Sequence, residues 1–179
     1  MSRIDPKKTL IVMALKQESQ GLIESLNMPL LYSGVGLIKS TQRLTQHLEK
    51  NKYERVLNLG TAGSRKWPQK SLLEVQKVSR RDKTLNWLNR SLELDLISNL
   101  PTGICGSADF VDTTDEVKNW DMLDMEAYAL ASVCGDLKIP FHSIKFITDF
   151  SDAQSQKDWE SLLLPAAQEF RSLLLRLTS

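Results

Sequence analysis

Short apolar runs recur along the chain, and amphipathic stretches separate them. An apolar run that is bounded by Gly, Pro or polar residues is typical of a strand buried on both faces. One run differs, because its apolar and polar residues alternate as in a partly exposed strand; it spans residues 72–78. The predicted strands span residues 9–14, 29–33, 56–59, 72–78 and 140–147, with a further strand end and turn at 103–107.

Apolar residues three or four positions apart mark the predicted helices between these strands. They span residues 17–26, 37–49, 126–134 and 157–177, and the stripe of the second contains Leu37, Ile38, Thr41, Leu44 and Leu48. Residues 80–100 show no firm period. Strands that alternate with helices predict an α/β protein with a largely parallel or mixed sheet between helices. We expect a single domain over residues 1–179.

The composition is ordinary for a globular protein, with 179 residues, of which 41% are apolar and 25% charged. Lys and Arg number 23 and Asp and Glu 22, and the resulting net charge of +1 favours neither a nucleic acid nor a membrane as partner. No apolar run approaches the roughly 18 residues that cross a bilayer. The N-terminal apolar segment is too short for a signal peptide. We therefore expect a cytoplasmic protein.

The few sulfur and imidazole side chains limit the chemistry further. Cys105 and Cys134 are far apart and have apolar neighbours, which indicates free buried thiols. The two histidines, His47 and His142, do not cluster with the cysteines. We therefore expect no metal site.

Two carboxylates stand at the ends of neighbouring predicted elements. Glu126 opens the helix 126–134, and Asp149 follows the strand 140–147. Ligands of open α/β sheets bind at the carboxyl ends of the strands, so both carboxylates are well placed for chemistry. The alternative is a helix-start carboxylate favoured by the helix dipole, together with an acidic loop residue. Glu18, one turn into the first helix, is either a solvated carboxylate or a third acid at this edge.

Two glycine-rich segments, 33–36 and 60–63, each follow a predicted strand. Glycine lets a backbone approach a ligand closely, although such segments also serve as simple strand-to-helix connections. Neither matches a dinucleotide-binding or a P-loop motif. Phe110 is either a core residue or a platform that stacks on a flat ligand. Arg81 lies in a charge run at 79–82 that we expect on the surface.

Five short motifs occur in one order over most of the chain. They are Ala-Leu-Lys-Gln-Glu at 14–18, Ser-Gly-Val-Gly at 33–36, Asn-Leu-Gly-Thr-Ala-Gly at 58–63, Asp-Met-Glu-Ala at 124–127 and Ile-Thr-Asp at 147–149. From about residue 9 to 175 the chain resembles the nucleoside phosphorylase/nucleosidase superfamily, and most of all its methylthioadenosine/S-adenosylhomocysteine nucleosidase branch. The resemblance implies an α/β three-layer sandwich, a central mixed sheet flanked by helices. It also implies a homodimer.

The resemblance implies a role for each acid. Asp149 is expected to protonate the purine at N7, a role that a dry pocket or a nearby like charge would support. Glu18 is expected to orient and deprotonate the attacking water, and Glu126 to hold the ribose hydroxyls. The remaining implied substrate-binding residues are Met125 under the sugar, Phe110 stacked on the base, the Val111 backbone at the base edge, Thr61 and Ala62 beside the sugar, and the Thr148 hydroxyl.

The chain departs from the family in places. The family has Arg and Ser where this chain has Lys145 and Thr148; threonine keeps the hydroxyl, but lysine cannot reproduce a guanidinium fork. The aromatic motif reads Gly-Ser-Ala-Asp-Phe at 106–110 instead of Ser-Gly-Asp-x-Phe. The segment between Gly63 and Gly103 is short for the branch, and in relatives it shapes the pocket for the 5′ substituent.

The leading hypothesis is a purine nucleoside N-ribohydrolase that needs no cofactor. Its small-molecule substrate would be methylthioadenosine, S-adenosylhomocysteine or a related 5′-modified nucleoside such as futalosine. A nucleoside phosphorylase is the alternative enzyme, with Arg65 and Arg81 as candidates for its phosphate site. A non-catalytic module that binds purine nucleosides is the third hypothesis.

Overall fold

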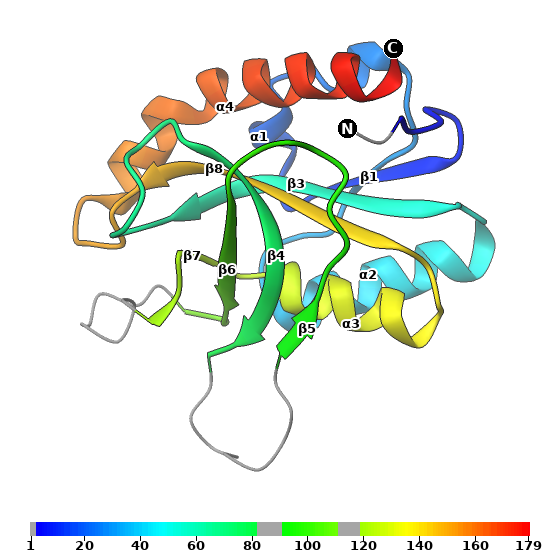
Figure 1. The fold of residues 1–179 in the computed structure, drawn as a ribbon, viewed down its shortest axis with the longest axis horizontal. Coiled ribbons are helices and arrows are strands. Elements are labelled where there is room, and N and C mark those ends of the chain that lie inside the picture. Colours follow the sequence, from blue (N-terminus) through cyan, green and yellow to red (C-terminus); the bar gives the residue numbers. More distant parts are fainter. Residues whose placement is uncertain (1–2, 82–90, 111–118) are drawn as a thin grey trace.

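The computed structural model describes residues 3–81, 91–110 and 119–179, and it builds an α/β fold (Figure 1). Its strands are β1 Thr9–Met13, β2 Leu30–Tyr32, β3 Arg55–Gly63, β4 Leu72–Arg80, β5 Ser91–Glu93, β6 Thr102–Ser107, β7 Met122–Asp124 and β8 Phe141–Asp149. Its helices are α1 Lys16–Ser19, α2 Leu37–Lys50, α3 Ala127–Asp136 and α4 Ser155–Thr178, with a 3₁₀ turn η1 at Glu24–Leu26.

In the described part of the chain these strands form one mixed sheet. At one edge, β1 lies between β2 and β3, and all three are parallel. β3 continues the sheet in parallel to β8, which runs antiparallel to β4. β4 and β6 are parallel, as are β6 and β7, and β7 returns antiparallel to β3. Part of the sheet therefore closes on itself through β3, β8, β4, β6 and β7.

Helices cover the sheet from two sides, which confirms the predicted α/β class with a mixed sheet between helices. Figure 1 shows α4 and α1 on one side and α2 and α3 on the other. The side chains of β1 divide between two cores, because successive residues of a strand face opposite ways. Leu10 and Val12 pack in the cluster that contains α2 and α3 residues, whereas Ile11 and Met13 pack in the cluster of α4. This two-sided burial explains why β1 reads as a continuous apolar run.

The predicted helix over 17–26 is wrong in extent. Its α-helical part ends at Ser19, and only the short turn η1 follows. The backbone enters the left-handed region at Gln20 (φ 49°) and again at Gly21 (φ 74°), and a right-handed helix cannot continue through these angles. The break leaves Glu18 buried on a short helix that follows β1.

Two further predictions need correction. The segment 60–63 is not a turn, because β3 runs through it to Gly63, with a shift in its pairing with β8 between Ala62 and Gly63. The helix over 37–49 is confirmed, but its buried face differs from the predicted stripe. Leu44 and Leu48 are buried, whereas Thr41 is exposed and Ile38 is 80% exposed.

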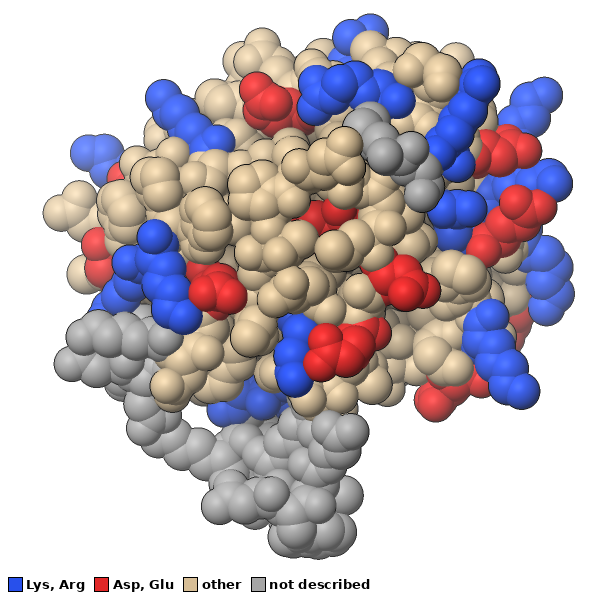
Figure 2. All heavy atoms as spheres, viewed as in Figure 1, with Lys and Arg blue, Asp and Glu red and all other residues tan. Residues whose placement is uncertain are grey.

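The two cysteines and the charged surface side chains lie where the composition leads us to expect them. Cys105 and Cys134 are both buried and free, as predicted. On the face seen in Figure 2, Lys and Arg lie among Asp and Glu without a large area of one sign, as expected for a nearly balanced net charge. Among the described residues, no helix combines the length and the apolar character that crossing a membrane requires.

Candidate active site

A pocket of about 510 Å³ opens where β1, β3, β7 and β8 end, beside the start of α4. Strand ends of an α/β sheet are the usual place for a ligand. The pocket contains the predicted site residues Glu18, Thr61, Ala62, Phe110, Met125, Glu126, Thr148 and Asp149. The structure thus brings them together from distant parts of the sequence. Val111, the other predicted binding residue, lies outside the described residues.

Glu18 is buried, and each of its carboxylate oxygens accepts a backbone hydrogen bond. Oε2 accepts from the N–H of Leu15 at 2.9 Å, and Oε1 accepts from the N–H of Thr61 at 3.1 Å. The hydroxyl of Thr61 adds a third bond to Oε1 at 3.0 Å. Three donors around one carboxylate hold it in one orientation.

Glu126 directly precedes α3, and its side chain reaches across to the glycine-rich turn before α2. Its Oε1 accepts from the N–H of Gly36 at 2.9 Å, so this turn binds a carboxylate of the protein itself. Burial and the nearby charge of Asp124 raise the pKa of Glu126 to about 8. Around neutral pH this carboxyl group is therefore present in both forms, and it can donate to or accept from a hydroxyl group.

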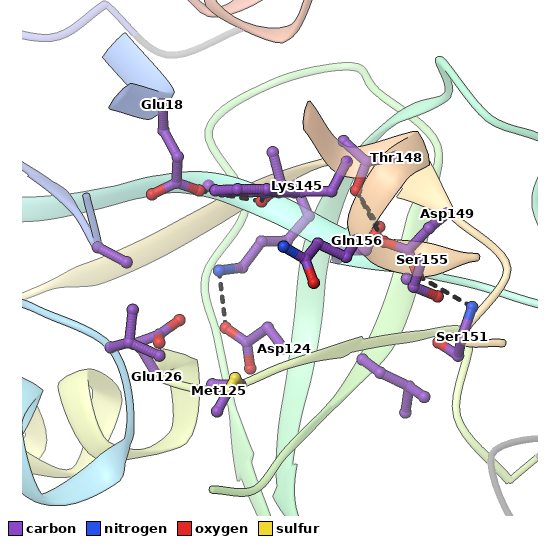
Figure 3. Close-up of a pocket in the computed structure, with 18 of the residues that line it drawn as sticks. Glu18, Asp124, Met125, Glu126, Lys145, Thr148, Asp149, Ser151, Ser155 and Gln156 are labelled. Atoms are coloured by element: carbon purple, nitrogen blue, oxygen red, sulfur yellow. Dashed lines mark hydrogen bonds and ion pairs between the residues drawn. The ribbon is translucent and has the colours of Figure 1, made fainter. Parts of the chain in front are cut away.

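A buried ion pair lies beside these two glutamates in the lining of the pocket. The Nζ of Lys145 on β8 is 2.7 Å from the Oδ2 of Asp124 on β7. The same Oδ2 accepts from the N–H of Ala127 at 2.9 Å, and Oδ1 accepts from the hydroxyl of Ser107 at 2.5 Å. Figure 3 shows Lys145 pointing toward Asp124, with Glu18 and Glu126 on one side and Asp149 on the other. The pair fixes the start of α3, and with it Glu126.

Asp149 is the last residue of β8 rather than a loop residue, so its position is set by the sheet. Its Oδ1 accepts from the N–H of Ser151 and its Oδ2 from the hydroxyl of Thr148, both at 2.9 Å. Gly63 lies directly opposite, and a Cβ atom there would come within 2.7 Å of Oδ1. A glycine at this point of β3 leaves room for the carboxyl group.

Phe110 is half exposed and lines the pocket, so part of its side chain is available to contact a flat ligand. The guanidinium carbon of Arg81 lies 5.1 Å from the centre of that ring, and its Nη2 donates to the carbonyl of Phe110 at 3.0 Å. The prediction of a surface position for Arg81 is wrong, because this side chain is only 7% exposed and lines the pocket. The contacts of Arg81 with the ring and the carbonyl offset the free-energy cost of burying its charge.

The pocket also contains Asp124, Lys145 and Trp159, for which the sequence predicted no role. Asp124 stands in the Asp-Met-Glu-Ala motif that also contains Glu126. Lys145 is a position at which the sequence departs from the pattern of the family that it resembles. Trp159, on the first turns of α4, donates its indole N–H to the Thr61 hydroxyl at 2.8 Å. No sequence pattern indicates that contact, since the partner residue is 98 positions away.

The donor set of the pocket suits proton transfer. Among residues 3–81, 91–110 and 119–179, no three His, Cys, Asp or Glu side chains are arranged to hold a metal ion. Glu18, Glu126 and Asp149 reach one pocket from different elements, and each has its own hydrogen-bond partners. A pocket of this kind can supply a proton at one point and remove one at another.

No family model matches the chain. Among solved structures, a mutant of the Helicobacter pylori 5′-methylthioadenosine nucleosidase with 5′-methylthioadenosine in its active site aligns with TM-score 0.83 and 18% identity, over 96% of this chain and 97% of that one. The Campylobacter jejuni 5′-methylthioadenosine/S-adenosyl homocysteine nucleosidase aligns with TM-score 0.81 and 20% identity, over 96% and 98%. The Helicobacter pylori futalosine hydrolase aligns with TM-score 0.82 and 18% identity, over 97% of each chain. The chain therefore has the fold of these nucleosidases, as the sequence motifs predicted.

Proposed function

We propose that this protein is a purine nucleoside N-ribohydrolase, which cleaves the bond between a purine base and its ribose with water. The observation that carries the proposal is the meeting of Glu18, Glu126 and Asp149 in one pocket at the strand ends. The likeness to solved nucleosidases also supports it; at 16–20% identity this is a likeness of fold.

Breaking an N-ribosidic bond develops positive charge on the sugar and negative charge on the base, much as glycoside hydrolysis does. We assign Asp149 as the acid that protonates N7 of the purine, which makes the base a better leaving group. Glu18, on the other side of the pocket in Figure 3, accepts the proton of the attacking water. An acid and a base at separate points meet both needs of the reaction.

The remaining residues hold the nucleoside. Phe110 is half exposed, and the base can stack on its ring. Glu126 binds the ribose hydroxyls, and its pKa of about 8 allows it to act as either donor or acceptor toward them. Met125 lies under the sugar, and Thr61, Ala62 and Thr148 complete the walls around it.

We propose methylthioadenosine, S-adenosylhomocysteine or a related 5′-modified nucleoside such as futalosine as substrate. A similar structure holds 5′-methylthioadenosine, and another is a futalosine hydrolase, so the shared fold accommodates both. Water is favoured over phosphate as the nucleophile, because the Glu18 carboxylate would repel a phosphate ion. Arg65, one candidate for a phosphate site, donates instead to the carbonyls of Phe150 and Ser151.

One assay tests the proposal. The protein is incubated with methylthioadenosine, S-adenosylhomocysteine, futalosine and inosine, each with and without phosphate, and free base is measured by chromatography. Release of base without phosphate is the expected result. Release only with phosphate would make the protein a phosphorylase, and binding without release under either condition would make it a non-catalytic module.

A further inference from the structure

A chain of hydrogen bonds leads from α4 to the proposed general base. The indole Nε1 of Trp159 donates to the hydroxyl oxygen of Thr61 at 2.8 Å, and that hydroxyl lies 3.0 Å from the Oε1 of Glu18. The contacts join three elements that are far apart in sequence: α4, β3 and α1.

The direction of these bonds is determined by their chemistry. An indole N–H can only donate, so the Thr61 hydroxyl must accept from Trp159. A hydroxyl has one proton, and with its oxygen occupied by the indole that proton is directed to Glu18. The backbone N–H groups of Leu15 and Thr61 already donate to the two oxygens of Glu18. Every group in this network therefore donates toward the carboxylate, and none accepts a proton from it.

From this geometry we infer that Trp159 is a positioning residue for the hydrolysis proposed above. By fixing the proton direction of the Thr61 hydroxyl, its indole N–H keeps a hydrogen-bond donor aimed at Oε1 of Glu18 and holds that carboxylate in one orientation toward the attacking water. Without the indole, the Thr61 hydroxyl can rotate, and it can accept a proton from a protonated Glu18. The inference rests on the proposed function for its kinetic consequences, but not for its effect on the titration of Glu18.

Other ionisable groups also face Glu18, and the test must leave them unchanged. Lys145 on β8 is one, since its Nζ and the Oε1 of Glu18 both lie next to Gly60. Glu126 before α3 and Tyr32 on β2 also face it, because the charge of Glu18 contributes to raising the pKa of each. Substitutions at Trp159 and Thr61 keep all three groups, so a changed pH dependence would report on the hydrogen-bond chain.

The decisive variants are Trp159→Phe, which keeps an aromatic ring and removes the N–H, and Thr61→Val, which removes the hydroxyl. We expect Trp159→Phe to lower kcat by about threefold to tenfold near pH 6, with KM within about twofold. The acidic limb of its pH–rate profile should move to higher pH. Thr61→Val should have a larger effect of the same kind, and Thr61→Ser should restore the wild-type profile.

A double variant and a control separate positioning from a structural effect. If the indole acts through the Thr61 hydroxyl, adding Trp159→Phe to Thr61→Val should change neither kcat nor the acidic limb further. Trp67→Phe makes the same substitution at a residue outside the pocket lining, and it should match the wild type. Equal and additive losses in both backgrounds would overturn the inference.

A titration keeps the inference testable without catalysis. The carboxyl carbon of Glu18, assigned with Glu18→Gln, is followed by carbon-13 NMR as a function of pH. Trp159→Phe should move its midpoint to higher pH, and Trp67→Phe should not. An unchanged midpoint in Trp159→Phe would refute the positioning role. A shifted midpoint in a protein that releases no base would refute only the proposed hydrolysis.

Discussion

Lys145 and Asp124 form an ion pair in the lining of the pocket, with Nζ and Oδ2 2.7 Å apart and both side chains 1% exposed. Burial alone would raise the pKa of Asp124, but the charge of Lys145 and several hydrogen bonds hold it below its ordinary value. Burial would likewise lower the pKa of Lys145, and the charge of Asp124 outweighs that effect and raises it. Each charge is therefore stable in the interior because the other is present.

Lys145→Met should destabilise the fold, because it leaves the Asp124 carboxylate buried without its partner. We expect a loss of about 3–5 kcal/mol in the free energy of unfolding near pH 7, measured by urea denaturation. The loss should shrink as the pH falls toward 4, since the unpaired Asp124 can then be protonated. The double variant Lys145→Met/Asp124→Asn should recover much of the loss. A single variant as stable as the wild type would contradict this account of the pair.

Glu126 should make stability depend on pH between about 4.5 and 8. Its pKa is raised from 4.5 to about 8, so in this range the folded protein keeps a proton that the unfolded chain has released. The contribution of Glu126 to the free energy of unfolding is therefore fully present below about pH 4.5 and falls as the pH rises to 8. Relative to the wild type, Glu126→Gln should gain about 2–4 kcal/mol between pH 5 and pH 8 in urea denaturation.

Removal of a charge elsewhere is the control for that experiment. Glu49 is exposed on α2, and the stability of Glu49→Gln relative to the wild type should stay flat over the same pH range. A flat difference for Glu126→Gln as well would show that Glu126 has an ordinary proton affinity in the folded protein.

The fold was predictable where burial is strong and regular. β1 and β8 are buried along their whole length and appear as apolar runs, and α2 and α4 show one-sided stripes. β5 and β7 were not predicted, because each has three residues and neither lies between Pro and Gly as the equally short β2 does.

The prediction of a turn at residues 60–63 was wrong for a different reason. Glycine weakens a strand pattern, so a turn was the natural reading. In the structure, Gly60 lies next to Lys145 and Glu18, and Gly63 next to Asp149, so these glycines leave space for side chains of the pocket. Such a contact depends on the whole fold. The sequence could therefore indicate the three acids, since Glu18 and Asp149 follow predicted strands and Glu126 opens a predicted helix, but not the residues packed around them.

Replacement of either proposed catalytic acid by its amide should abolish most of the activity. Glu18→Gln and Asp149→Asn keep the size of the side chain and remove its ability to transfer a proton. We expect each to lower kcat for the best nucleoside of the panel by about 10²–10⁴-fold, the usual contribution of a general acid or base. Glu49→Gln, outside the pocket, should retain wild-type turnover. Full activity in Glu18→Gln or Asp149→Asn would refute the role of that residue.

Gly63→Ala should impair the reaction by steric displacement of Asp149. The added Cβ would come within 2.7 Å of its Oδ1 and would also clash with the Ser151 hydroxyl, so the carboxyl group has to move. Because a misplacement of about 1 Å can cost about 10²-fold in rate, we expect kcat to fall by about 10- to 100-fold. Gly135→Ala in α3 is the matched control, since its Cβ would meet nothing within 4 Å. It should stabilise the helix by about 0.5–1 kcal/mol in thermal or urea unfolding and leave kcat unchanged. Wild-type turnover in Gly63→Ala would mean that the position of Asp149 does not limit the reaction.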